Sequence, residues 1–426
     1  MTTLTLAVLA AVPLLAVAVI IGMRAPLRFL LAAYAALVPF GSGISLSVGL
    51  PSQLETLSTF AGFFTAVAIV ARLAVSPRRP SRLLPVVPVW ILFLALTGLT
   101  VMWSPDQETT TGEFLLLAAV MGLFLIVAVS PVEKLDVLAV ELGIVLGGVV
   151  IGSYGVVALL QGGLQETAGG IPRLATAGGG ATGQAGANIT AASLLLPLAV
   201  AAGRALKASL VSSRITWFLA AAVVATGITL TGSRGGLLAC VPLVFVVMLN
   251  ERRRKLALMA GVVVLAVIGL VFAALPGQTQ SHLSTQSSSG RTDIWRVGLL
   301  ACEEHCWVGS GWGTFEHVYN ETLGLGPGST GKRLHNKAHN IWVGTAVEAG
   351  FLGVILMTLG LIMTAREVLR LPPALRGPPL AGLVGVVFSN GFLSNIDFKY
   401  FWLAIIYCTL VVLAHESSER LRTSVA

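Results

Sequence analysis

The feature that most constrains the fold is a succession of long apolar runs that fills most of the 426-residue chain. Most runs are about 17–22 residues long, the length that a helix needs to cross the hydrocarbon core of a bilayer. Their approximate bounds are 3–22, 27–45, 55–74, 84–103, 112–130, 137–160, 187–203, 215–232, 235–250, 256–275, 339–365, 378–396 and 400–415. The runs predict an all-α polytopic membrane bundle of about 12–13 transmembrane helices.

The composition agrees with a membrane protein. Hydrophobic residues make up 55% of the chain and charged residues 11%, with a mean hydropathy of +0.88; a soluble domain carries roughly 25% charged residues. A membrane β-barrel would show short alternating segments instead. The first run lacks a basic segment before it and a second run follows almost at once, so we interpret it as a retained helix and not as a signal peptide.

Basic residues orient the bundle, because loops rich in Arg and Lys stay in the cytoplasm. They occupy every second loop: Arg24, Arg28, Arg72, Arg78, Arg79, Arg82, Arg204, Lys207, Arg214, Arg252, Arg253, Arg254, Lys255, Arg366, Arg370, Arg376, Arg420 and Arg422. The net charge of +8 therefore reflects topology and does not indicate a nucleic-acid partner. We predict N-terminal membrane helices over 1–275, an outward loop over 276–338, C-terminal membrane helices over 339–415 and a cytoplasmic tail over 416–426.

The outward loop contains the segment "RTDIWRVGLLACEEHCW". Its apolar positions Ile294, Val297, Leu300 and Ala301, with acids opposite, predict an amphipathic helix lying on the membrane surface. Cys302 and Cys306 would lie about 6 Å apart on such a helix, near the upper limit for a disulfide. The sequence allows these cysteines to form a disulfide or to remain as two free thiols. Joint binding of a metal ion is a further alternative.

Three arginines are candidates for binding an anion. Arg234, in "TGSRGGLL", falls at the outward end of an apolar run, where arginine is costly; with Ser233 it could form an anion site, or it could extend its charge to the membrane surface. Arg291 opens the amphipathic segment, where a helix start favours anions, although Asp293 could pair with it instead. Arg173 lies in a Gly-rich outward loop before Asn188, either as part of a mobile substrate gate or as a solvated cation.

Two histidines stand at the seam between the outward loop and an apolar run, in "HNKAHNIWVGTAVEAGFLG". His339 is expected at the N-cap or in the first turn, where the helix dipole lowers the pKa of an imidazole below its usual value of about 6.5. A neutral imidazole beside an anion site suits a general base, although His339 could also be a helix cap at the interface. Asn340 could donate a hydrogen bond from the first turn, and His335 could help to shape the site.

A metal site is weakly indicated. His335 and His339 are four residues apart, but zinc usually takes three or four ligands, and His335 precedes the expected helix start. We therefore expect neither a metal nor another cofactor. The sequence also has no P-loop, GxSxG, HExxH or dinucleotide-binding motif.

Four stretches together resemble the O-antigen ligase and polymerase superfamily of polytopic membrane glycosyltransferases. They are "PRLATAGGGATGQAGANITAA", "TGSRGGLL", "GRTDIWRVGLLACEEHCWVGSGWGTFEHVY", and "HN" followed after nine residues by "GFLG". Their order and spacing agree over about residues 170–355. The last motif is the most specific of the four.

The resemblance implies an activity and a site. Such proteins transfer a glycan from undecaprenyl pyrophosphate to an acceptor sugar at the outer face of the cytoplasmic membrane, without a nucleotide or an essential metal. By resemblance Arg234 and Arg291, and more loosely Arg173, hold the pyrophosphate, and His339 is the base. Asn340, His335, Ser233 and Asn188 would support them.

We therefore predict an O-antigen ligase that works without a metal, inverts the anomeric configuration and transfers the glycan to another glycan or to the lipid-A core. The single large outward loop and the His-Asn motif favour a ligase over a polymerase, which would add another repeat unit, and attachment to protein or a wall polymer is a third alternative. The alternative from another class is a transporter or flippase of a lipid-linked glycan, which would show inverted repeats and helices broken at the midplane.

Overall fold

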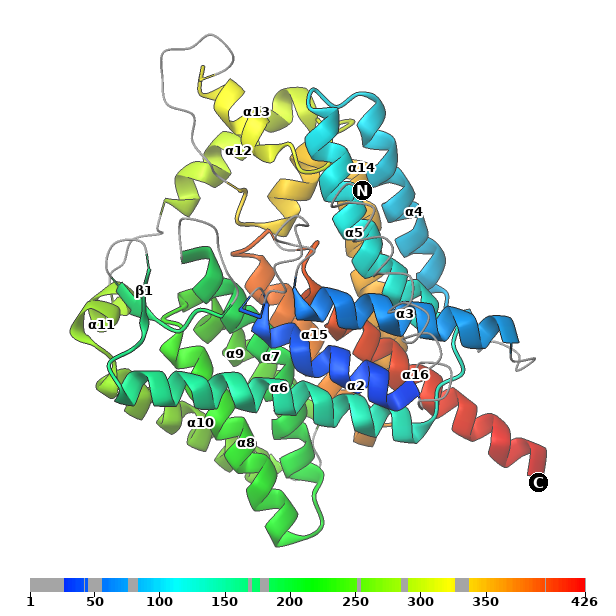
Figure 1. The fold of residues 1–426 in the computed structure, drawn as a ribbon, viewed down its shortest axis with the longest axis vertical. Coiled ribbons are helices and arrows are strands. Elements are labelled where there is room, and N and C mark those ends of the chain that lie inside the picture. The colour runs from blue at the N-terminus through cyan, green and yellow to red at the C-terminus, as the bar shows by residue number, and fades with distance from the viewer. Residues whose placement is uncertain are drawn as a thin grey trace, which may run out of the picture.

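A computed structural model describes residues 27–41, 43–44, 56–75, 83–167, 171–176, 184–250, 254–284, 290–325, 337–394 and 396–425. The expected span over 3–22 and the candidate His335 lie outside the described residues. Within these ranges the chain is a bundle of helices with one short antiparallel hairpin (Figure 1). The prediction of an all-α polytopic membrane protein is confirmed.

The elements follow the order of the apolar runs. The first part contains α2 (Leu27–Leu37), the 3-10 helix η1 (Val38–Phe40), α3 (Leu57–Val75), α4 (Val86–Leu99), the 3-10 helix η2 (Thr100–Met102), α5 (Gln107–Ala128), α6 (Lys134–Leu160), β1 (Gln165–Thr167) and β2 (Ile171–Arg173). The second part contains α7 (Gln184–Lys207), α8 (Val211–Leu230), α9 (Arg234–Asn250), α10 (Arg254–Ala274), α11 (Gly277–Ser284), α12 (Arg291–His305), α13 (Phe315–Thr322), α14 (Ile341–Leu369), α15 (Pro373–Asn390) and α16 (Lys399–Val425).

Seven helices of the described ranges are long and apolar enough to cross a bilayer. They span Leu57–Val75, Gln107–Ala128, Lys134–Leu160, Gly186–Lys207, Val211–Leu230, Ile341–Leu369 and Lys399–Arg420. Shorter apolar helices cover Leu27–Phe40, Val86–Met102 and Arg234–Asn250. In the span at α7, 94% of the apolar window is buried, so this Ala- and Leu-rich helix forms the centre on which α6, α8, α9 and α15 pack.

Helices α12 and α13 lie together at one end of the molecule, beside the start of α14 (Figure 1). Helix α12 buries Ile294, Gly298 and Ala301, and it packs against α14 and α13. Leu299 and Leu300 remain 61% and 53% exposed, so Leu300 does not share the face that α12 buries in the protein. Cys302 and Cys306, which the sequence left open, form a disulfide.

Helix α14 is interrupted at Gly350, whose φ of 70° is outside the helical region. The break frees backbone groups that segment 306–311 satisfies: the Phe351 amide donates to the Cys306 carbonyl (2.7 Å), and the Gly311 amide donates to the Glu348 carbonyl (3.0 Å). A Cβ at Gly350 would lie 2.9 Å from the Trp307 carbonyl oxygen. Gly350 therefore joins a broken helix to the segment after α12.

Candidate functional site

Arg173, the last residue of β2, has a buried guanidinium that is fixed by two hydrogen bonds. Its Nε donates to the Thr231 carbonyl (2.6 Å), and an Nη donates to the side-chain oxygen of Asn188 on α7 (3.1 Å). The side chain passes close to Gly232 in the turn between α8 and α9, where a Cβ would lie 3.4 Å from the Arg173 Nε. The hairpin, α7 and this turn thus hold one cation in place.

Arg234 is the first residue of α9, as the sequence indicated. The preceding Ser233 accepts a hydrogen bond from the Gly236 amide at its Oγ (3.2 Å), which caps the helix. The Arg234 guanidinium donates to the main-chain carbonyl of His282, at the end of α11. Helix α11 is tied in turn to the hairpin, because Thr279 Oγ1 donates to the Pro172 carbonyl (2.7 Å).

Arg291 completes the group of cations as the first residue of α12, after Gly290 with a φ of 75°. Burial, followed by repulsion from Arg291 and Arg234, lowers the pKa of Arg173 to about 10. Burial and the Arg234 charge also lower the pKa of Arg291. The structure therefore brings together three arginines that are spread over more than a hundred residues of sequence. Their mutual repulsion favours the binding of an anion among them.

His282 belongs to the same group and was missed from the sequence. Burial lowers the pKa of its imidazole, and Arg173, Arg234 and Arg291 lower it further. In the sequence His282 lies in a short polar stretch, "QTQSHLS", without any pattern that sets it apart. Only the packing of α11 against β2 reveals it.

His339 lies within electrostatic reach of Arg291, one residue before the cap of α14. It adopts a φ of 48°, an uncommon conformation for a residue with a side chain. Burial is the main cause that lowers the pKa of His339 to about 4, and the charges of Arg291 and Lys337 add to it. The imidazole is therefore neutral at neutral pH, although burial and nearby cations, rather than the helix dipole expected from the sequence, are the reasons.

The cap itself is Asn340. Its side-chain oxygen accepts hydrogen bonds from the amides of Trp342 (2.9 Å) and Val343 (3.1 Å). The sequence had placed His339 at the N-cap or in the first turn and Asn340 as a donor from the first turn. The structure shifts each role by one position, because the short amide side chain of Asn340 satisfies two amides at the helix start.

Residues 218–358 match the sequence model of the O-antigen ligase family. The matched segment is consistent with the O-antigen ligase and polymerase superfamily. It includes Arg234, Arg291 and His339, whereas Arg173 and Asn188 come before it. No curated protein sequence matches the chain. The matched family implies, in general terms, a membrane enzyme that transfers glycosyl groups and interacts with a lipid-linked glycan, and the resemblance inferred from the motifs is confirmed.

The strip 337–340 is held from two sides. The Trp295 indole on α12 donates to the Ala338 carbonyl (3.0 Å), and the Asn340 amide donates to Ser394 Oγ after α15 (3.0 Å). Both bonds fix the backbone on either side of His339. The orientation of His339 therefore depends on α12, which also carries Arg291, and on the segment that links α15 to α16.

No group of three or more His, Cys, Asp and Glu side chains within the described ranges has a geometry that could hold a metal ion. The charges that could meet an anionic ligand at this site are guanidinium groups of the chain itself. Of the eight residues expected at the site, the structure places Arg173, Asn188, Ser233, Arg234, Arg291, His339 and Asn340 in one network of contacts and electrostatic interactions.

Proposed function

We propose that the protein transfers a glycan from undecaprenyl pyrophosphate to an acceptor sugar at the outer face of the cytoplasmic membrane, as an O-antigen ligase. The observation that carries this proposal is the convergence of three arginines with one neutral histidine. The family match supports glycosyl transfer in general. The donor, the acceptor, the membrane side and the residue roles are inferred from chemistry.

The arginines would bind the pyrophosphate of the donor. A guanidinium offers paired donors to phosphate oxygens, and fixed cations stabilise the charge that develops on a leaving group. Arg173 is already oriented by Thr231 and Asn188, and Arg234 by the His282 carbonyl. The cations would therefore need little reorganisation as the anomeric carbon–oxygen bond breaks, and no metal is required for this role.

His339 would act as the general base. The acceptor hydroxyl attacks the anomeric carbon, its proton passes to the imidazole, and undecaprenyl pyrophosphate leaves from the opposite face with inversion. A base must be unprotonated before the step, and a pKa of about 4 keeps His339 in that form at neutral pH. The transferred proton then produces an imidazolium beside the anionic pyrophosphate, which would offset the repulsion from Arg291.

The test is transfer by the full-length protein in lipid, supplied with undecaprenyl-pyrophosphate glycan and either a lipid-A core acceptor or further repeat units. Transfer to the core identifies a ligase, and lengthening of the donor identifies a polymerase. His339→Ala should reduce the rate by about 10²-fold or more while donor binding persists. The matched control is His305→Ala at the end of α12, which should keep the wild-type rate. Full transfer by His339→Ala would overturn the role of the base.

The membrane side needs a separate test. A cysteine introduced by Ser329→Cys should react with a membrane-impermeant maleimide on intact cells, because position 329 lies in the loop expected to face outward. Ser212→Cys, exposed in the first turn of α8 beside a loop expected in the cytoplasm, should react only after permeabilisation. The native cysteines do not interfere, since Cys240 and Cys408 are buried and the other two form a disulfide. The opposite labelling pattern would reverse the orientation.

A further inference from the structure

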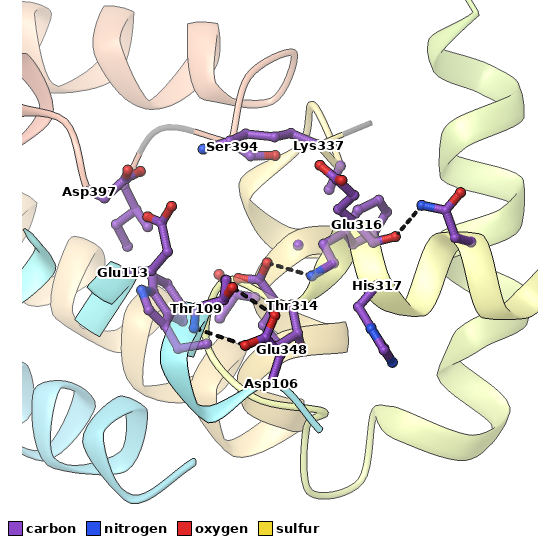
Figure 2. Close-up of a pocket in the computed structure, with 18 of the residues that line it drawn as sticks. Asp106, Thr109, Glu113, Thr314, Glu316, His317, Lys337, Glu348, Ser394 and Asp397 are labelled. Carbon is purple, nitrogen blue, oxygen red and sulfur yellow. Dashed lines mark hydrogen bonds between the residues drawn. The ribbon is translucent and has the colours of Figure 1, made fainter. Parts of the chain in front are cut away.

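A second feature of the molecule is a cavity that is lined by acids and borders the strip of backbone that carries His339. A cavity of about 290 Å³ opens between the start of α5, α13, the start of α14 and the segment after α15 (Figure 2). Lys337 and Ala338, from the strip that carries His339, form part of its wall. Ser394, which fixes the Asn340 amide, lines it as well. The cavity and the arginines therefore share one strip of backbone, with His339 in it.

The lining of the cavity is rich in hydrogen-bonding groups. Six carboxyl groups border it, those of Asp106, Glu113, Glu316, Glu321, Glu348 and Asp397. Figure 2 shows Glu113 and Asp397 on one side of the cavity and Glu316 on the other. Apolar residues also line it, among them Trp312, Phe315 and Ile341. Many acceptors beside apolar side chains suit a compact ligand with several hydroxyl groups.

Two backbone arrangements fix these acids in place. Gly313, with a φ of 83°, packs against Glu113 so closely that a Cβ would lie 2.6 Å from the Glu113 Cγ. Glu348 accepts a hydrogen bond from the Phe315 amide at Oε1 (3.1 Å). Because Glu348 lies beside the break in α14, the broken helix positions one wall of the cavity.

The charges of the cavity select against anions. Lys337 and His317 are the basic side chains of the lining, against six acids. The pKa of Lys337 is raised, chiefly by Asp397 and also by Glu113, Glu348 and Glu316, so this cation is engaged by the acids around it. Burial raises the pKa of Asp397, whereas the Lys337 charge lowers it. An added carboxylate or phosphate would meet repulsion here and attraction at the arginines.

We propose that this cavity binds the accepting end of the acceptor as an uncharged, hydroxyl-rich sugar and excludes acidic sugars. The inference rests on the proposed function, because it assigns the second substrate of that reaction to the other side of the strip 337–340. The donor pyrophosphate lies at the arginines, and the acceptor sugar lies among the acids. His339 is linked to both sites electrostatically, because after burial its pKa is lowered by Arg291 at the first site and by Lys337 at the second.

The carboxylates would act as acceptors for sugar hydroxyl groups and so orient one hydroxyl toward His339. They are positioning and binding groups, and the proton of the reacting hydroxyl still goes to the imidazole. The bond that forms joins that oxygen to the anomeric carbon of the donor, and the bond that breaks joins the same carbon to the pyrophosphate. No further reactant is needed.

The first test measures binding without any donor. Saturation-transfer NMR on the full-length protein in lipid nanodiscs uses methyl β-glucoside as the neutral probe and methyl β-glucuronide as its acidic counterpart. The wild type should bind the neutral probe, and its affinity for the acidic probe should be lower by about tenfold, the cost of an unfavourable charged contact. Equal binding of the two probes, or no binding of the neutral one, would overturn the inference.

The second test uses Glu113→Gln and Asp397→Asn, with Glu303→Gln on the exposed face of α12 as the matched control. The two cavity variants should raise the KM for the acceptor by about tenfold and leave the KM for the donor unchanged, and the control should change neither. An unchanged acceptor KM in folded variants would overturn the cavity assignment and leave the proposed function standing. Selective binding of the neutral probe without any transfer would support the cavity and contradict the proposed function.

Discussion

The guanidinium of Arg173 donates a hydrogen bond of 3.1 Å to the side-chain oxygen of Asn188. This contact links the hairpin before α7 to α7 itself, the most enclosed of the membrane helices. It also fixes a cation whose pKa is already lowered by burial and by two other arginines. Three arginines that repel one another stay together only if the surrounding structure holds them. Neutral hydrogen-bond partners such as Asn188 should therefore matter for donor binding as the arginines do.

Replacing Asn188 tests whether Arg173 must be held. Asn188→Ala should raise the KM for the lipid-linked donor by about tenfold or more, because a hydrogen bond to a charged group contributes about 1.5–3 kcal/mol. The control is Asn250→Ala at the end of α9, which removes an equivalent contact with Arg376 (2.6 Å) away from the site. Steady-state kinetics at saturating acceptor check the prediction. Similar donor KM values for the two variants would contradict it.

The pKa of His339 predicts the acid limb of the pH profile. Its folded-state pKa of about 4 lies below the usual value of about 6.5, so the base is unprotonated at neutral pH and is lost as the pH falls through about 4. The profile of kcat/KM, which reports the free enzyme, should therefore stay flat down to about pH 5. A limb centred near the usual histidine value would show that another group titrates.

The charge of Arg291 contributes to that low pKa, which gives a second observable. Arg291→Gln should move the acid limb of kcat/KM to higher pH, because removing a nearby cation makes the imidazolium less unfavourable. Arg296→Gln, one turn further along α12 and exposed, is the control and should leave the limb in place. A loss of donor affinity alone would lower kcat/KM at every pH without moving the acid limb. A shift of the limb therefore shows an electrostatic effect on His339.

The sequence predicted the starts of single helices better than it predicted how distant segments pack together. Arg234 and Arg291 open helices as expected, because a glycine-bounded turn precedes each one. His282 and Lys337 could not be found, since each lies in a polar segment whose position depends on packing with distant elements. The break at Gly350 was also missed. A glycine in an apolar run indicates helix packing, and only segment 306–311 supplies partners for the groups that the break frees.

Substitution at this break should destabilise the fold. Gly350→Ala would place a Cβ 2.9 Å from the Trp307 carbonyl oxygen at a φ of 70°, and backbone strain of this type costs about 1–3 kcal/mol. Gly122→Ala in α5 is the control, because no atom lies within 4 Å of its Cβ position. Thermal unfolding in detergent should show a lower midpoint for Gly350→Ala alone. Equal midpoints would mean that α14 can close the break without cost.

A last prediction concerns Glu141, a buried acid on α6 that pairs with Arg204 near the end of α7. Glu141 accepts hydrogen bonds from Arg204 Nε (2.6 Å) and from the Tyr407 hydroxyl (2.5 Å), and its side chain is 7% exposed against 34% for Arg204. Removing one partner of a fully buried pair costs about 3–5 kcal/mol. Since Arg204 can still reach solvent, Glu141→Ala should cost less, about 2 kcal/mol.

Tyr407→Phe should cost less again, about 1 kcal/mol, because the carboxylate keeps Arg204 as its partner. Thermal unfolding of both variants tests this order. Arg204 lies roughly 24 Å along α7 from Asn188 at 1.5 Å per residue, so neither change should alter the donor KM or the acid limb of the pH profile. A kinetic effect as large as that of Asn188→Ala would show that this ion pair is coupled to the arginines through α7, and that α7 transmits changes between the two membrane surfaces.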